Sequence, residues 1–297
     1  MTKLNARASI IAVAALLVAQ AGARQAAAVA FPDKNLETAV RALLFDKKDP
    51  AVELTEEDLR KIFILEAKGK GIKDLTGLDQ CPNLQLLDLA NNEVTDVAPL
   101  KDCKNLQSLD LSKNTIADIG PLAGLEALQY LELSNNQITT LPSLEALVKL
   151  SALYLSGNQI ADLAPLEKLP KLTSLHLAAN KITDIAPLAP LTKLSLLKLS
   201  GNCIEDISAL GKLNNLSLLL LEKNKISDLA PLVESCKADA EGEKRFAPYL
   251  RLYLAGNPLS EAAKNEQVPA LQGFGVKVHL EEEPPANPPA DQAASGQ

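Results

Sequence analysis

Three carboxylates occupy one position of this sequence at intervals of 22 residues: Asp88, Asp110 and Glu132. Paired carboxylates can act as general acid and base, and clustered carboxylates can bind a cation. Catalysis also needs a site that excludes water, and the chain has no Gly-x-Ser-x-Gly, His-Glu-x-x-His or phosphate-loop motif and only two histidines. We therefore predict no catalytic residue, no metal site and no bound cofactor, and an enzyme is the less favoured class.

A second series of aspartates recurs once per repeat, just before a turn. These carboxylates could form a row of calcium ligands, or each could cap the backbone N–H groups of its own turn. Capping needs only one aspartate per turn and no ion, so we predict turn caps. The series consists of Asp96, Asp118, Asp162, Asp184, Asp206 and Asp228.

Asparagine gives the strongest periodic signal in the chain. A stack of equivalent coils would place one amide per coil at the same bend, where it can bond backbone groups that the bend leaves unpaired. Leucine and isoleucine recur with the same period, and with 47% hydrophobic but only 3% aromatic residues the core must be aliphatic. The pattern predicts a repeat array. The asparagines are Asn92, Asn114, Asn136, Asn158, Asn180, Asn202 and Asn224.

Each coil is predicted to contain one strand and one return segment. A Leu-x-Leu pair forms the strand with both leucines facing inward, and a proline in most return segments forbids a long helix there. We therefore predict an α/β solenoid, a curved right-handed horseshoe with a parallel sheet on its concave side and turns or 3₁₀ segments on its convex side.

The repeat array is predicted to span residues 62–258, between two caps that cover its ends. Residues 31–61 form an N-terminal helical cap, with one helix over Phe31–Phe45 and a second that begins at Thr55. Near 234–248 an insertion, either a loop or a short helix, interrupts the period, and Tyr249 is expected to resume it. Residues 259–280 form a C-terminal cap with a helix and a closing strand.

The two ends of the sequence predict export. Within residues 1–30, Lys3 and Arg7 precede an apolar run and small residues, the order of a secretory signal peptide. The run is too short to cross a bilayer, so we expect no membrane span in the mature chain. Residues 281–297 are an acidic, Pro-rich segment that is predicted to be disordered and carries no wall-sorting signal. We predict a protein that is secreted or located in the periplasm or cell envelope.

Charge and cysteine usage limit the partners further. Loss of Lys3 and Arg7 with a signal peptide changes the formal net charge from −7 to −9, which argues against nucleic acid as a partner. Cys81 and Cys103 fall at the same position of adjacent coils, so they either form a disulfide or remain reduced in the core. The spacing of the cysteines does not match a metal site.

The repeats resemble the leucine-rich repeat consensus Leu-x-x-Leu-x-Leu-x-x-Asn-x-Ile over about residues 62–259. The 22-residue length and the Asp-Ile-x-Pro-Leu segment are similar to the internalin class of bacterial surface proteins, and the phosphatase-1 regulatory subunit has similar repeats. The resemblance implies a protein that binds other proteins on its concave side. The chain differs from the internalins in having no wall-sorting signal and no immunoglobulin-like module.

The residues that flank the inward leucines should project from the concave sheet, a surface that we name the strand face. Its first third is acidic, its middle is aromatic and polar, and its last third has exposed leucines, which often mark a contact site. We predict that partner-binding residues on this face include Asp88, Asp110, Glu132, Tyr130, Tyr154, His176, Lys198, Leu196, Leu218, Leu220, Arg251 and Tyr253.

Several interpretations of the strand face remain open from the sequence. The carboxylates could serve only solubility, His176 could be a neutral hydrogen-bonding group, and the leucines could pack beneath the insertion. The favoured hypothesis is an exported, non-enzymatic module that binds a protein partner. The alternative is a structural or carbohydrate-binding component of the envelope, with Tyr130 and Tyr154 as the sugar-stacking residues.

Overall fold

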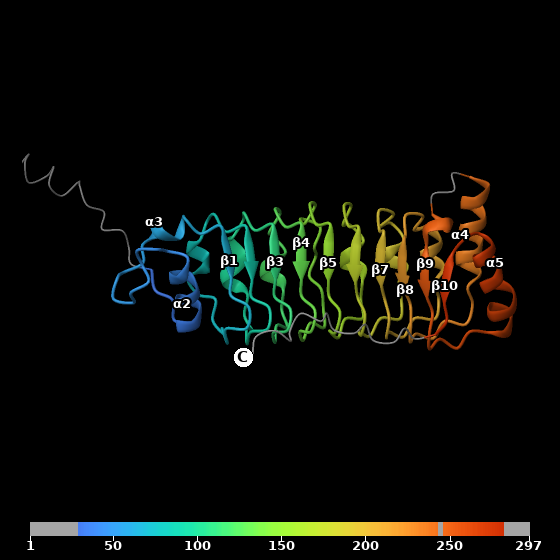
Figure 1. The fold of residues 1–297 in the computed structure, drawn as a ribbon, viewed down its shortest axis with the longest axis horizontal. Coiled ribbons are helices and arrows are strands. Elements are labelled where there is room, and N and C mark those ends of the chain that lie inside the picture. Colours follow the sequence, from blue (N-terminus) through green and yellow to red (C-terminus); the bar gives the residue numbers. More distant parts are fainter. Residues whose placement is uncertain (1–28, 243–245, 282–297) are drawn as a thin grey trace, which may run out of the picture.

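The computed structural model describes residues 29–242 and 246–281, which form one elongated stack of coils (Figure 1). Ten parallel strands make a single sheet in chain order, as the predicted solenoid requires. Most of the predicted signal peptide and of the acidic tail lies outside the described residues. The strands are β1 Ile64–Glu66, β2 Leu86–Asp88, β3 Ser108–Asp110, β4 Tyr130–Glu132, β5 Ala152–Tyr154, β6 Ser174–His176, β7 Leu196–Lys198, β8 Leu218–Leu220, β9 Arg251–Tyr253 and β10 Lys277–His279.

Each strand is three residues long, and β1 to β9 share one burial pattern. The central residue is buried in the aliphatic core, as Leu153 is in β5, and the two flanking residues face outward, whereas the central Val278 of β10 is only partly buried. Neighbouring strands pair without any shift, so equivalent positions stand side by side along the whole sheet. The sheet therefore carries two parallel rows of outward side chains.

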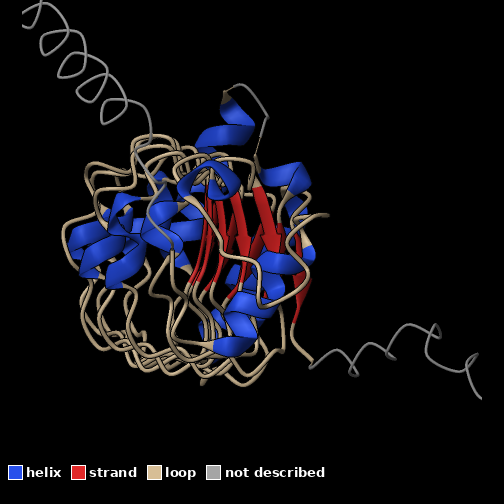
Figure 2. Ribbon diagram, turned by 90° about the vertical axis from the view of Figure 1, so that its left-hand side faces the viewer, coloured by secondary structure: helices blue, strands red, loops and turns tan. Residues whose placement is uncertain are grey.

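Short 3₁₀ helices form the opposite side of most coils, as predicted (Figure 2). Proline near the start of most of these helices fits the first turn, where a missing N–H costs nothing. The coil between β4 and β5 has no helix, and there Pro142 stands at a different position in the repeat. The helices are η1 Leu78–Gln80, η2 Ala98–Asp102, η3 Gly120–Leu122, η4 Ala164–Leu166, η5 Ala186–Leu188 and η6 Ser208–Lys212.

The asparagine ladder is buried, and each amide joins two coils. Asn158 donates to the carbonyl oxygens of Leu133 and Leu155, both at 3.0 Å, and its Oδ1 accepts the Ile138 N–H at 3.0 Å. All seven ladder asparagines are between 6% and 9% exposed. Asn257 repeats the arrangement after the insertion and forms an eighth rung.

Two helices cover the first coil. The helix α2 (Lys34–Ala42) is shorter than the predicted one, and α3 (Glu56–Leu59) begins with a capping box formed by Thr55 and Asp58. Asp33 caps α2 with one carboxylate oxygen, and its other oxygen accepts the N–H groups of Lys73 and Asp74. This one side chain therefore ties the cap to the array.

The insertion near 234–248 contains a helix that begins before it. This helix, α4 (Ala230–Glu241), starts in the return segment of its coil and packs against η6. After η7 (Ala247–Tyr249), the strand β9 resumes the array. The prediction that Tyr249 resumes the core was wrong, because Tyr249 is 68% exposed and Leu250 is buried instead.

The C-terminal cap contains a π-helical turn, η8 (Ala263–Gln267), the helix α5 (Val268–Gly273) and the closing strand β10. Among the cysteines, Cys81, Cys103 and Cys236 are buried, Cys203 is partly exposed, and all four are free thiols. Of the two alternatives for Cys81 and Cys103, the structure therefore has the pair of reduced thiols in the core and not the disulfide. None of the helices in the described ranges is both long and apolar enough to cross a membrane.

Candidate interaction surface

The structure places all twelve predicted residues in the two outward rows of the strand face. Asp88, Asp110, Glu132, Tyr154 and His176 follow one another on adjacent strands, each in direct register with the next. Eleven of the twelve side chains are partly buried by their neighbours, and Arg251 is exposed. The repeat fixes their spacing, while their identities change from coil to coil.

The carboxylates at the start of the face close their own turns. Asp88 accepts the Ala90 N–H at 2.9 Å, and Glu132 accepts the Ser134 N–H at 2.7 Å. Burial raises the pKa of Glu132, with Asp110 contributing, although the hydrogen bonds from Ser134 oppose the rise. Such bonds reduce the cost of placing like charges on adjacent strands.

A fourth carboxylate of the same row was not among the predicted binding residues. Glu66 pairs in register with Asp88, at the exposed end of β1. Glu66 lies between Leu65 and Ala67, as Asp88 lies between two leucines. It was not predicted because the first coil has alanine in place of the second leucine. The period alone would have identified Glu66.

An aromatic cluster forms the centre of the strand face. The rings of Tyr130 and Tyr154 meet edge to face at 5.4 Å, and the Tyr154 ring stacks on His176 at 4.0 Å. The Ser174 hydroxyl lies 3.3 Å from the Tyr154 hydroxyl. Burial raises the pKa of Tyr130 to about 12, with the nearby Glu132 contributing. His176 covers one face of the Tyr154 ring.

The surroundings of His176 favour its neutral form. Burial lowers its pKa, and the positive charge of Lys198 on the next strand lowers it further. This agrees with the interpretation of His176 as a neutral hydrogen-bonding group rather than a charged one.

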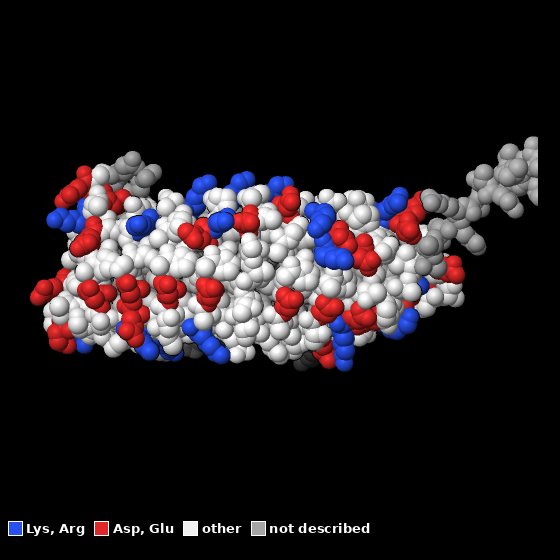
Figure 3. All heavy atoms as spheres, turned by 180° about the vertical axis from the view of Figure 1, so that it is seen from behind, with Lys and Arg blue, Asp and Glu red and all other residues white. Residues whose placement is uncertain are grey.

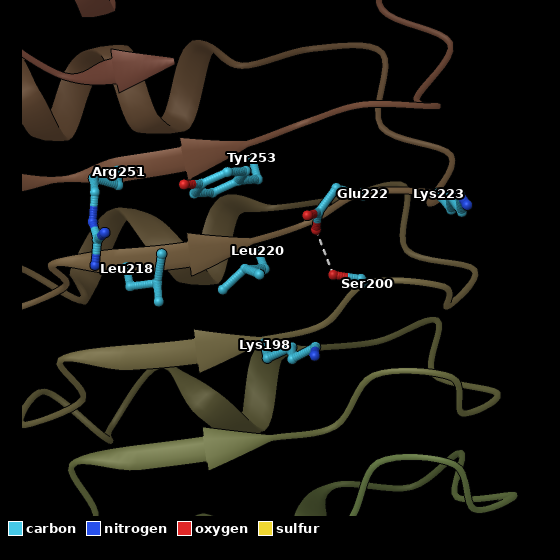
Figure 4. Close-up of a pocket in the computed structure, with 8 residues that line it drawn as sticks. All are labelled: Lys198, Ser200, Leu218, Leu220, Glu222, Lys223, Arg251 and Tyr253. Carbon is cyan, nitrogen blue, oxygen red and sulfur yellow. Dashed lines mark hydrogen bonds between the residues drawn. The ribbon is translucent and has the colours of Figure 1, made fainter. Parts of the chain in front are cut away.

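The last third of the face contains an open hollow of about 510 Å³, with Leu218, Leu220, Arg251 and Tyr253 projecting into it from two adjacent strands (Figure 4). At its edge, the Ser200 hydroxyl donates to the Glu222 carboxylate. The alternative that the insertion covers these leucines was wrong. Its helix α4 packs on η6, and no described residue of the insertion lines the hollow.

Two further residues extend this end of the face beyond the predicted array. His279 stacks on Tyr253 with ring centres 4.3 Å apart, and Lys277 pairs in register with Arg251. Neither was among the predicted residues, because the repeat consensus ends before β10. The alternating pattern of residues 276–280 predicted the strand but not its pairing with β9.

The second series of aspartates lies on the turn side and caps the return segments, as predicted. Asp96 accepts the Ala98 N–H at 2.8 Å, and Asp184 accepts the Ala186 N–H at 2.8 Å. Figure 3 views this side and shows acidic side chains at regular intervals along the stack. Within the described residues, no three His, Cys, Asp or Glu side chains are placed to hold a metal ion together.

Comparisons with known proteins agree with this architecture. A leucine-rich repeat family model matches residues 104–160 and 170–226, a two-copy model matches 148–190, and a third leucine-rich repeat model matches 80–98. No curated protein matches the sequence.

Solved structures with this fold include two bacterial proteins. Internalin C2 of Listeria monocytogenes is 30% identical, with a TM-score of 0.58 over 84% of this chain and 94% of that chain. A leucine-rich repeat protein of Leptospira interrogans is 27% identical, with a TM-score of 0.61 over 69% of this chain and 50% of that one. From its repeats, its single parallel sheet and these similarities, the chain belongs to the internalin-like class of bacterial leucine-rich repeat proteins.

Proposed function

We propose that this chain is an exported, non-enzymatic protein that binds a protein partner on its strand face. The observation that supports this most strongly is the contrast between the two sides of each strand. The inward positions are almost all leucine, whereas the outward rows carry acidic, aromatic, basic and apolar side chains in turn. Variation confined to one face of a constant scaffold is typical of a recognition surface.

The strand face also has the physical properties that association requires. Its side chains are held at fixed spacing by a hydrogen-bonded sheet, so binding orders few groups and loses little conformational entropy. Tyr130, Tyr154, Tyr253 and Arg251 belong to residue types that often dominate binding energy in interfaces. The hollow beside Leu218 offers apolar surface next to charged groups.

Two further parts of the proposal rest on the sequence and on the class of protein. Export is supported by the order of charged, apolar and small residues within 1–30, and leads to a place in the envelope or the medium. The absence of catalysis is supported by membership of a class that typically serves as a scaffold. Leucine-rich repeat proteins generally bind proteins, which favours a protein as the partner.

Site-directed photocrosslinking in the native envelope tests the proposal. A photoreactive phenylalanine analogue replaces Tyr154 in one strain and Glu167 in another, because Glu167 is exposed on the turn side of the coil that contains β5. We expect a crosslinked protein adduct from position 154, identified by mass spectrometry, and little adduct from position 167.

A matched variant connects the adduct to the proposed residues. Tyr154→Ala combined with Lys198→Ala should weaken capture of that partner by about tenfold or more. The melting temperature should stay nearly unchanged, because both side chains lie outside the core. Equal adducts from both positions, or full capture by the double variant, would show that binding does not depend on this face.

A further inference from the structure

We infer that the strand face pairs with the strand face of a second copy of this chain, in an antiparallel dimer with two-fold symmetry. The inference rests on the proposed function of this face and names its partner. It starts from the order of charges along the sheet, whose strands follow one another in chain order (Figure 1). The outward rows carry Glu66, Asp88, Asp110 and Glu132 on β1–β4, and Lys198, Arg251 and Lys277 on β7, β9 and β10.

Symmetry leaves one arrangement that brings these opposite charges together. Two sheets that face each other can be related by a two-fold axis along the stack or along the strands. An axis along the stack places every strand opposite its own copy, so the carboxylates of both copies would repel one another. An axis along the strands, between β5 and β6, reverses the order and places β1 opposite β10 and β4 opposite β7.

The second arrangement produces complementary contacts, each of which occurs twice. Glu132 on β4 faces Lys198 on β7 of the other copy, and this is the pair of opposite charges in direct register. Glu66 on β1 and Asp88 on β2 lie opposite the strands that carry Lys277 and Arg251 in the other outward row, whereas Asp110 on β3 faces Leu220. At the centre, the Tyr154–His176 stacks of the two copies meet. Opposite charges in register across an interface favour one alignment and disfavour shifted ones.

Two charged residues beside the strand face do not follow the acidic-to-basic order along the sheet, and the antiparallel dimer accommodates both. Glu222 follows β8 at the basic end, but its carboxylate already accepts the Ser200 hydroxyl within the same copy. Lys68 follows β1 at the acidic end, two residues after Glu66. Its equivalent on β10 is Glu281, two residues after His279, so the two-fold axis brings these opposite charges together.

The size of the strand face agrees with a small, weak dimer interface. Ten strands spaced about 4.8 Å apart give a length of about 43 Å, and the three residues of each strand give a width of about 10 Å. Each copy therefore offers about 430 Å², below the roughly 800 Å² per partner of standard interfaces and in the range of weak complexes. Two concave sheets are farthest apart at their middle, so the contacts there depend on the long side chains of Glu132, Tyr154 and Lys198.

Sedimentation of the purified full chain and of two charge-reversal variants tests the dimer. We expect the unmodified protein to dimerise at low ionic strength and to dissociate in about 0.5 M salt, which screens the pairs. Glu132→Lys places two lysines at each contact, and Lys198→Glu places two carboxylates there. Each variant alone should weaken dimerisation by about tenfold or more.

Mixing the two variants is the decisive measurement. A pair of one Glu132→Lys chain and one Lys198→Glu chain restores opposite charges at both contacts, so the mixture should form heterodimers although neither variant dimerises alone. A folding defect in either variant could not be repaired in this way, and circular dichroism of each variant checks its fold. The matched control Lys181→Glu, on an exposed loop residue, should leave dimerisation unchanged.

Three outcomes would overturn the inference: a monomeric unmodified protein at low ionic strength, dimers of both single variants, or a mixture that stays monomeric. Each is separate from failure of the proposed function. A monomeric protein whose position 154 still crosslinks to another envelope protein would retain the strand face as a binding surface with a different partner. A dimer without any other crosslinked partner would support self-association alone.

Discussion

Each ladder asparagine satisfies backbone groups of two successive coils at once. The Asn158 amide bonds two carbonyl groups and the Ile138 N–H group. That N–H would otherwise be buried without a partner, whereas each carbonyl also accepts a bond from a neighbouring rung. Among uncharged side chains, only Asn and Gln combine two N–H donors with a carbonyl acceptor, and Gln is one methylene longer. The constant Asn in every regular coil is therefore a requirement of the backbone and not of a ligand.

Replacing one rung measures this requirement. We expect Asn158→Ala to lower the free energy of unfolding by about 3 kcal/mol, because it removes three buried hydrogen bonds and leaves the Ile138 N–H without a partner, although the Leu133 and Leu155 carbonyls each keep a bond from a neighbouring rung. Denaturant unfolding monitored by circular dichroism gives the value. A decrease below about 1 kcal/mol would indicate that water replaces the amide.

The same coil offers a matched control. The Ser156 hydroxyl is buried and has no hydrogen-bond partner among the described residues. Ser156→Ala removes a similar polar side chain two residues from Asn158 but breaks no hydrogen bond. Its free energy of unfolding should equal that of the unmodified protein or exceed it slightly.

At the scale of single residues, the sequence predicted which face of the sheet a side chain lies on, but not which side chains it contacts. Tyr154 was correctly placed on the outward row, because strand side chains alternate with a period of two. Its stacking on His176 and its edge contact with Tyr130 depend on side-chain torsions that no repeat pattern specifies. The burial of the ladder asparagines could be predicted, because their amides pair with backbone groups inside the bend.

At the scale of elements, the return segment that leads into α4 differs from the others. It begins with Ala230, Pro231 and Leu232, the same three residue types that begin η4 and η5. The residues that follow favour a helix, and the chain continues helically to Glu241, just before Gly242. The sequence located the extra residues, but the start of α4 was missed because the repeat consensus still held there.

The error at Tyr249 has a similar origin. The template counts backwards from Asn257 and assigns Tyr249 to the first leucine slot. The 3₁₀ turn η7 instead places Leu250 in the core, one residue later. Local backbone geometry after an insertion is set by the inserted segment, which the periodic template does not describe.

The capping box of α3 provides a test at the scale of an element. Burial alone would raise the pKa of Asp58, but hydrogen bonds from Thr55 and the ammonium groups of Lys47 and Lys61 lower it well below its usual range. Because the folded pKa is below the unfolded value of about 4, the Asp58 carboxylate contributes stability above that pH. The contribution is lost as the pH falls through the folded-state pKa.

Asp58→Asn should therefore lower the free energy of unfolding by about 1–2 kcal/mol at neutral pH. The difference from the unmodified protein should narrow as the pH falls below about 4, where the native carboxylate begins to lose its contribution. Urea unfolding at several pH values measures both effects. Glu57→Gln, on an exposed residue of the same helix, controls for the change of charge. A difference that is constant with pH would contradict the role of the Asp58 charge.

At the scale of the whole molecule, one hydrophobic core runs through every coil and both caps. Each coil packs only on its neighbours, so such an array can lose its ends first unless the caps hold them. Here the core includes Phe31 at one end and Leu271 at the other, both nearly inaccessible to solvent. We therefore expect the array to unfold as a single unit.

The reactivity of the native cysteines shows whether the array unfolds as a single unit. Cys81 and Cys236 lie towards opposite ends of the stack, are fully buried, and have a pKa that burial raises to about 12. Both should be alkylated at the same slow rate, set by global unfolding. Cys203 is partly exposed and should react at least about a hundredfold faster, because it needs no unfolding.

Peptide mapping by mass spectrometry during alkylation gives the rate at each site. A Cys203→Ser variant shows whether modification of the exposed thiol disturbs the others. If Cys236 reacted much faster than Cys81, the C-terminal cap would open on its own, and the array would not be a single cooperative unit.

The uniform alignment of the strands has a consequence for how this protein can evolve. Tandem duplication of one coil in the gene would add a strand and a ladder rung while leaving every existing backbone pairing intact, so longer descendants would fold readily. Their outward rows, however, would be one step longer than those of the parent. A long form and a short form could not align the charges at both ends of their sheets at once. A single duplication would therefore leave each form able to pair only with its own kind.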